Sequence, residues 1–193
     1  MNQGIGNNGI ILACNNRSKD TPEFDYYATD PIAVEKLLNV HSFKHDVWEP
    51  CCGEGHISNV LLSHGYDVYN TDIIDRGCND ETVDFMKIST IVCGQFEEDI
   101  VTNPPYKLGV DFVKKAIEIL ANECQIALLL KLTFMCSKGR AKFFEENPPK
   151  FIYVFSDRIE CAKNGNFEGK KGVDYAWFIW EKGWHGDTTL RWI

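Results

Sequence analysis

The run Asn103, Pro104, Pro105 and Tyr106 places a carboxamide, two rigid residues and an aromatic ring directly after an apolar segment. Proline fixes its own φ and disfavours the helical region for the residue before it, so Asn103 and both prolines are held extended, outside any helix or central strand. The motif therefore predicts a rigid loop that positions side chains. Taken alone, the same four residues also fit a simple turn.

A second loop, "EPCCGEG", joins a predicted strand to the helix after it. Gly53 and Gly55 let the backbone turn tightly and let a ligand approach the main chain near a helix N-terminus. The loop lacks the third glycine of the dinucleotide fingerprint and the lysine of a phosphate loop, and Glu49 and Glu54 repel phosphate but suit a cationic ligand. Asp72 ends the next predicted strand, where an acid can hold the ribose hydroxyls of a nucleoside. A purely structural turn remains the alternative for this loop.

The elements that must position these residues alternate along the chain. Helical patterns cover residues 29–38, 55–65, 109–122 and 137–147, and strand patterns cover residues 46–50, 67–73, 82–85, 99–103, 125–134, 150–156 and 174–182. Such alternation predicts an α/β fold with a mostly parallel seven-stranded sheet, helices on both faces and an antiparallel edge strand. Ligands of such sheets bind at the carboxyl edge, so the two loops converge on one crevice. Trp177 and Trp180 lie three apart in one strand and should pack on opposite faces.

The charge is divided unevenly. The net charge of −8 argues against a strongly basic nucleic-acid binder, but residues 1–100 carry −11 and residues 101–193 carry +3. A surface that faces a polyanion would therefore come mainly from the second half of the chain. The alternative is that basic residues such as Lys138, Arg140, Lys142, Lys170 and Lys171 are simply solvated.

Length and composition limit the other possibilities. The 193 residues fit a single domain, 1–193, in which residues 1–25 are irregular. The polar start and the lack of a long apolar run predict a cytoplasmic protein without a membrane segment. The eight cysteines and five histidines are scattered, without zinc spacing, so we expect reduced thiols and no metal.

The motifs together resemble the class I S-adenosylmethionine-dependent amino-methyltransferases with an N-P-P-Y motif, over nearly the whole chain. "YYATDP" looks like the motif before the first strand, "EPCCGEG" like the methionine-binding loop, "TDIID" like the ribose-binding acid, "VDF" like the adenine-binding turn and "TNPPY" like the catalytic loop. Their order is similar to the γ-type adenine-N6 DNA methyltransferases. More narrowly, "CAKNG", "YAWFIWEKG" and the terminal "RWI" resemble small methyltransferases of phages and prophages.

The resemblance implies a Rossmann-like class I methyltransferase fold, S-adenosylmethionine as cofactor, and methyl transfer to the N6 amine of adenine in DNA. It implies catalytic roles for Asn103, Pro104, Pro105 and Tyr106. The Asn103 oxygen and the Pro104 carbonyl can accept the two amine hydrogens, which favours a pyramidal nitrogen and fixes an in-line approach. Tyr106 would stack on an adenine flipped out of the DNA.

The resemblance also implies a set of cofactor-binding residues. They are Glu49, Gly53 and Gly55 around the methionine portion, Asp72 on the ribose, Asp84 on the adenine amine, Phe85 against the adenine ring, and Tyr27, Ala28 and Thr29 over the methionine end. Cys51 and Asn103 complete the set. A Pro-Cys pair can carry the nucleophile of cytosine carbon-5 methylation. Because Pro50 and Cys51 lie in the glycine loop, Cys51 is interpreted as a small residue of the cofactor pocket.

The identity of the acceptor stays open at this point. Phe167 and Lys171, in the long loop between the last two predicted strands, are either contacts for the target base and its backbone or ordinary exposed residues. The chain has no room for a separate target-recognition domain, so specificity is short or loose, or a protein partner supplies it. The acidic balance predicts weak, salt-sensitive DNA binding. Methylation of RNA or of a protein glutamine amide, and an inactive cofactor-binding module, remain alternatives.

Overall fold

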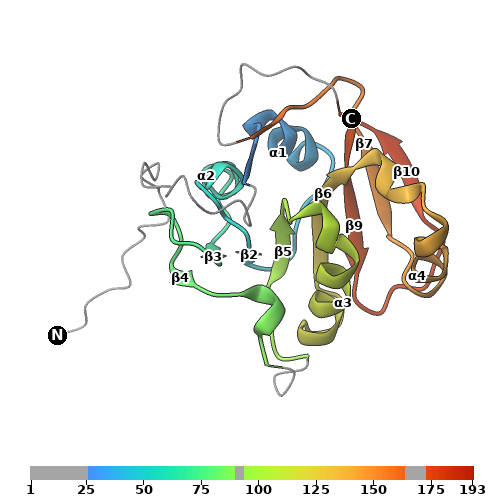
Figure 1. The fold of residues 1–193 in the computed structure, drawn as a ribbon, viewed down its shortest axis with the longest axis horizontal. Helices are drawn as coiled ribbons and strands as arrows, with labels where there is room; N and C mark the ends of the chain where they lie inside the picture. Colours follow the sequence, from blue (N-terminus) through green and yellow to red (C-terminus); the bar gives the residue numbers. More distant parts are fainter. Residues whose placement is uncertain (1–25, 90–93, 164–172) are drawn as a thin grey trace.

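The computed structural model describes residues 26–89, 94–163 and 173–193, and within them an eight-stranded sheet forms the centre of the protein (Figure 1). The strands follow the order β10-β7-β9-β6-β5-β2-β3-β4 across the sheet. Their bounds are β2 Val47–Glu49, β3 Val68–Asp72, β4 Glu81–Thr82, β5 Asp99–Thr102, β6 Gln125–Lys131, β7 Phe151–Val154, β9 Tyr175–Glu181 and β10 Thr189–Trp192. All neighbouring strands pair in parallel except β9, which runs antiparallel to both β6 and β7.

Helices cover both faces of the sheet. Helices α1 (Pro31–Leu38) and α2 (His56–Ser63) pack into one apolar cluster, and α3 (Gly109–Ile119) and α4 (Ala141–Glu146) pack into the other (Figure 1). Trp177 belongs to the first cluster and Trp180 to the second, and both are almost fully buried. The prediction that these two tryptophans pack on opposite faces of one strand is therefore confirmed.

Local sequence signals explain where these helices begin. The Asp30 side chain accepts a hydrogen bond from the backbone N–H of Ile32, and Pro31 occupies the first turn, where its missing N–H costs nothing. In α3, apolar residues recur every three or four positions, which buries Phe112, Val113 and Ala116 against the sheet. These helices fix the loops that precede them.

The C-terminal part of the sheet differs from the expectation in two ways. The sheet has eight strands rather than seven, because β10 adds to β7 at the edge. The antiparallel strand β9 is therefore internal, between β6 and β7, rather than at the edge. Every residue of β10 is exposed, so its side chains give no apolar alternation, and the strand forms through backbone pairing with a distant segment.

A small second sheet joins the start of the described chain to the long loop. Strand β1 (Tyr27–Thr29) pairs antiparallel with β8 (Cys161–Lys163), with Thr29 opposite Cys161. Neither strand was predicted. Residues 1–25 and the positions of Phe167 and Lys171 lie outside the described residues. Among the described helices, none has the length and apolar character needed to cross a membrane.

Candidate active site

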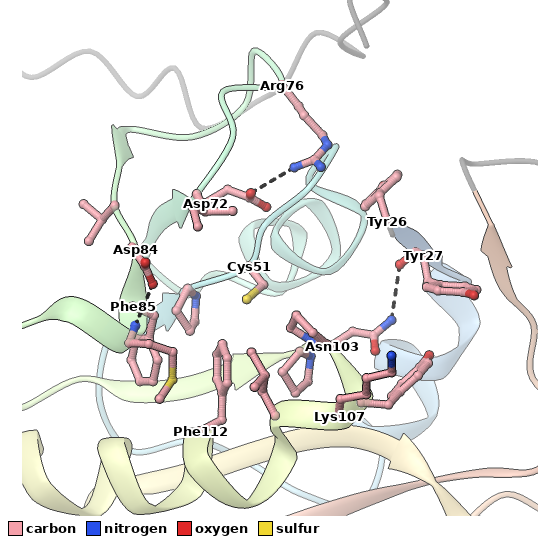
Figure 2. A pocket seen from close by; sticks show the side chains of 18 of the residues that line it. Tyr26, Tyr27, Cys51, Asp72, Arg76, Asp84, Phe85, Asn103, Lys107 and Phe112 are labelled. Atoms are coloured by element: carbon pink, nitrogen blue, oxygen red, sulfur yellow. Dashed lines mark hydrogen bonds and ion pairs between the residues drawn. The ribbon is translucent and has the colours of Figure 1, made fainter. Parts of the chain in front are cut away.

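A cavity of about 480 Å³ opens at the carboxyl edge of the sheet, where β2, β3 and β5 end. This volume lies within the range of small-molecule sites. Figure 2 shows Asp84 and Phe85 at one end, Asn103 and Lys107 at the other, and Cys51 between them. The two loops singled out in the sequence thus line one cavity, as the topology of parallel sheets predicts.

The Asn103 carboxamide is oriented by strand β1. Its Nδ2 donates to the backbone carbonyl of Tyr27 at 3.2 Å (Figure 2). It also donates to the Thr29 hydroxyl at 3.0 Å. A backbone carbonyl only accepts hydrogen bonds, so the nitrogen of the amide must face Tyr27. The Asn103 Oδ1 is buried and has no hydrogen-bond partner within the described chain. The site therefore holds an acceptor of fixed direction that is available to a ligand.

Tyr106 lies beside this acceptor in an aromatic and cationic environment. The rings of Tyr27 and Tyr175 lie 5.8 Å from the Tyr106 ring, centre to centre, and the Lys131 ammonium lies 4.9 Å from the Tyr106 ring centre. Burial raises the pKa of Tyr106 well above its ordinary value, so the phenol stays neutral. Interactions with the Cys161 thiol and the Tyr175 hydroxyl raise this pKa further. Tyr106 can therefore offer a neutral ring to a ligand but no base.

The two prolines extend the loop from β5 toward α3. Pro104 is buried and Pro105 is exposed, and both line the cavity. The Pro105 carbonyl accepts the backbone N–H of Leu108 at 2.8 Å and so starts the 3-10 turn Tyr106–Leu108. Since α3 follows this turn directly, the loop is anchored by β5 on one side and by α3 on the other.

Asp72 connects the end of β3 to the glycine loop. Its Oδ2 accepts the backbone N–H of Gly53 at 2.9 Å, and its Oδ1 accepts the backbone N–H of Ile74 at 2.9 Å. The Oδ1 also forms a buried ion pair with Arg76 at 2.9 Å (Figure 2). Asp72 and Arg76 both line the cavity. The carboxylate is thus held in place by its neighbours, and Arg76 is a cavity residue that the sequence reasoning missed.

Tyr26 covers the glycine loop and was also missed. Gly53 has a φ of +57°, and a Cβ there would lie 2.2 Å from the Tyr26 ring, so both the backbone conformation and the ring require glycine. The Tyr26 hydroxyl accepts the backbone N–H of Glu54 at 3.2 Å, and the Arg76 guanidinium lies 5.0 Å from the centre of the Tyr26 ring. The signal in the sequence was the first tyrosine of "YYATDP".

Asp84 and Phe85 form the far end of the cavity. Asp84 caps the turn Phe85–Lys87 by accepting the backbone N–H of Met86 at 3.1 Å, and it pairs with Lys87 at 3.0 Å. Phe85 stacks on Phe112 with ring centres 4.8 Å apart. This end therefore combines a carboxylate with two aromatic rings.

Burial shifts the pKa of one carboxyl group and one thiol group at the first loop. Burial raises the pKa of Glu49 well above its usual value, against the hydrogen bond that it accepts from the Ser58 hydroxyl. Burial, together with the charges of Asp72 and Glu49, raises the pKa of Cys51 in the same way. A protonated thiol is a poor nucleophile, which agrees with the interpretation of Cys51 as a pocket-lining residue.

The cavity brings together most of the residues that the sequence singled out. Those that line it are Tyr27, Cys51, Asp72, Asp84, Phe85, Asn103, Pro104, Pro105 and Tyr106. Glu49, Ala28, Thr29, Gly53 and Gly55 do not line it. Thr29 acts on the site through Asn103, and Gly53 through Asp72 and Tyr26.

No protein-family model and no curated protein sequence matches the chain, but solved structures share its fold. A predicted O-methyltransferase from Agrobacterium tumefaciens aligns with a TM-score of 0.58 and 14% identity, over 84% of this chain and 85% of that one. A protein from Pyrococcus horikoshii assigned as an RNA methyltransferase aligns with a TM-score of 0.57 and 14% identity, over 91% of this chain and 94% of that one. The type IIG restriction endonuclease BpuSI aligns with a TM-score of 0.56 and 13% identity, over 86% of this chain and 26% of its own.

At this level of identity the comparisons define the fold. The chain has the Rossmann-like class I methyltransferase fold, with a mostly parallel sheet and helices on both faces. The fold class expected from the motifs is thereby confirmed. The names of the similar proteins differ in substrate, so the acceptor must be argued from the site.

Proposed function

We propose that the protein transfers a methyl group from S-adenosylmethionine to the N6 amine of adenine in DNA. The observation that carries the proposal is the Asn103 amide, whose nitrogen is fixed by Tyr27 and Thr29 while its buried oxygen lacks a partner in the described chain. Leaving a buried acceptor unpaired costs about 1 to 3 kcal/mol, which a ligand N–H would recover. The site is thus suited to a substrate that donates from an amine.

The residues present fit the cofactor. S-adenosylmethionine combines a cationic sulfonium with a nucleoside and supplies an electrophilic methyl group when bound. Asp72 offers a carboxylate to the ribose, Asp84 offers one to the adenine amine, and Phe85 with Phe112 offers rings to the adenine. Tyr26 and the glycine loop lie over the same cavity, at the end of β2.

The Asn103 oxygen would accept one hydrogen of the acceptor amine. An exocyclic adenine amine is a poor nucleophile because its lone pair is delocalised into the ring. Hydrogen bonds to the Asn103 oxygen and the Pro104 carbonyl favour a pyramidal nitrogen and aim the lone pair. The neutral Tyr106 ring would stack on the base, and the raised pKa of Tyr106 excludes it as a base near neutral pH.

Adenine in DNA is the preferred acceptor among the possible amines. The asparagine at position 103 favours adenine, since the cytosine-N4 enzymes that the motif resembles more often carry serine there. RNA adenine and a protein glutamine amide pose the same lone-pair problem and are the alternatives to be tested. The oriented Asn103 amide and the intact cavity count against an inactive module.

Methyl transfer from labelled S-adenosylmethionine tests the proposal. The purified protein is offered double-stranded DNA, single-stranded DNA, RNA and protein extract, beside Asn103→Ala and the matched control Asn59→Ala, which alters an exposed asparagine of α2. We expect N6-methyladenine in DNA from the wild type and Asn59→Ala, and none from Asn103→Ala. Transfer only to RNA or protein would show that DNA adenine is not the acceptor. Cofactor binding without any transfer would contradict the proposed methyltransferase activity.

A further inference from the structure

Two lysines that have no acidic partner among the described residues lie at the Tyr106 end of the cavity. Lys107 follows Tyr106 in the 3-10 turn and is exposed, whereas Lys131 ends β6 and is half-buried. Both line the cavity, and Figure 2 shows Lys107 at its Asn103 end. The Lys131 ammonium lies over the Tyr106 ring, 4.9 Å from the ring centre.

Among the described residues, Lys44, Lys114, Lys138 and Lys182 also lack an ion pair with a carboxylate, but only Lys107 and Lys131 of these unpaired lysines line the cavity. Five other lysines form ion pairs with a carboxylate within 4.0 Å, namely Lys36, Lys87, Lys115, Lys142 and Lys150. Across the ranges that the structure describes, neither Lys107 nor Lys131 has such a pair. The chain carries 28 acidic against 20 basic residues, so acidic partners are not scarce. Positive charge beside Tyr106 is therefore left uncompensated within the described protein.

The position of Lys131 links this charge to stacking on Tyr106. A planar base that stacks on the ring face under the ammonium must displace Lys131, and the cation–π contact is then lost. A nucleotide carries a phosphate next to its base, within reach of a lysine side chain that has been displaced. A glutamine amide brings no anion and would leave both ammonium groups unpaired.

We infer that Lys107 and Lys131 form a binding site for the phosphodiester backbone next to the target nucleotide, so that the acceptor is a polynucleotide rather than a protein amide. This inference rests on the proposed function, because it takes Tyr106 as the stacking ring. Lys131 exchanges its contact with the Tyr106 ring for a phosphate when the base arrives. Lys107 extends the same positive charge to the exposed mouth of the cavity.

Equilibrium binding of a fluorescent, adenine-containing oligonucleotide tests the site without requiring catalysis. Affinity is measured between 50 and 200 mM salt for the wild type, Lys107→Met, Lys131→Met, the double variant, and the control Lys114→Met, which removes an exposed lysine of α3 outside the cavity. Each phosphate contact contributes about 0.7 to 0.9 to the slope of log affinity against log salt. We expect the double variant to lose about 1.5 of this slope and Lys114→Met to keep it.

Methyl transfer separates failure of the inference from failure of the proposed function. We expect the double variant to lose transfer to the oligonucleotide but to retain transfer to free adenosine, which carries no phosphate, and to bind S-adenosylmethionine as the wild type does. An unchanged salt slope in the double variant, or transfer by the wild type to protein alone, would overturn the phosphate site. A wild type that binds the oligonucleotide with the expected slope yet methylates nothing would overturn the proposed activity and support the site.

Discussion

Strand β5 carries a buried polar residue, Asp99, at its start and a half-buried one, Asn103, just past its end, and the fold satisfies their hydrogen bonds to different degrees. Asp99 at the start is fully buried, and its two oxygens accept three backbone N–H groups, from Lys44 at 2.9 Å, His45 at 3.2 Å and Gln125 at 2.6 Å. The Asn103 nitrogen donates to Tyr27, to Thr29 and, at 3.9 Å, to the Cys161 sulfur, whereas its oxygen has no partner within the described chain. A buried polar group whose hydrogen bonds are all formed stabilises the fold, whereas one that keeps an unpaired acceptor is available to a ligand.

This comparison also explains a cluster at the amino edge of the sheet. The side chains of His45, Asp99 and Cys124 bring atoms that can ligate a metal within 4.8 Å of one another. Three hydrogen bonds from backbone N–H groups already satisfy the Asp99 carboxylate, which thereby connects the segment before β2 to the start of β6. The opposite ends of one strand thus have separate tasks, stability at one end and chemistry at the other.

Removing the Asp99 carboxylate should have the largest effect, a loss of stability. Asp99→Ala leaves three backbone N–H groups without their acceptor, and we expect the free energy of unfolding to fall by about 3 kcal/mol or more. Chemical denaturation measures this change, with Asp46→Ala as a control that removes an exposed carboxylate nearby. A loss below about 1 kcal/mol would show that Asp99 is not the anchor described here.

Weakening the hydrogen bonds that orient the Asn103 side chain should have a smaller effect, on the rate of catalysis rather than on stability. Thr29→Val removes the hydroxyl that accepts the shortest hydrogen bond of the Asn103 nitrogen, so the amide samples wrong orientations. We expect kcat to fall about tenfold, with S-adenosylmethionine affinity unchanged. Thr29→Ser keeps the hydroxyl and should turn over like the wild type. Equal rates for the valine and serine variants would show that the Thr29 hydroxyl does not position Asn103.

The pH dependence of stability tests the role of Glu49, which is buried at the same edge as Asn103 but does not line the cavity. Burial raises the pKa of Glu49, so the folded protein keeps this proton to a higher pH than the unfolded chain does. Between the ordinary and the raised pKa, unfolding releases a proton, and stability falls as pH rises, by up to about 1.4 kcal/mol per pH unit.

We expect Glu49→Gln to lack this slope in denaturation curves measured from pH 4 upward. Glu145→Gln, which changes an exposed carboxylate of α4, should retain it. The same slope in Glu49→Gln and the wild type would mean that Glu49 ionises in the folded protein as it does in water.

Local signals predicted the helices and most strands, whereas distant pairings were missed. The Asp30 cap and Pro31 identified α1 because a helix start is specified within a few residues. Strand β10, with exposed side chains, and the pairing of β1 with β8 depend on partners far along the chain, which periodicity does not report.

The same limit applies to the candidate site. Asn103 and Tyr106 stood out because two prolines mark their loop, and Asp72 because it ends a strand. The two oxygen partners of the Asn103 nitrogen lie 74 and 76 positions away, on a three-residue strand too short to give a pattern. Arg76 and Tyr26 were missed because their contacts with Asp72 and the glycine loop form only in the folded chain.

The single-turnover rate of methyl transfer by Asn103→Ala tests the central claim most directly. The rate is measured on the best acceptor of the wild type, together with the free energy of unfolding and the affinity for S-adenosylmethionine. We predict a rate at least about 100-fold lower, as for other preorganised polar groups at reacting centres, with unfolding changed by less than about 1 kcal/mol. A rate close to that of the wild type would show that the unpaired Asn103 oxygen is not the group that receives the amine.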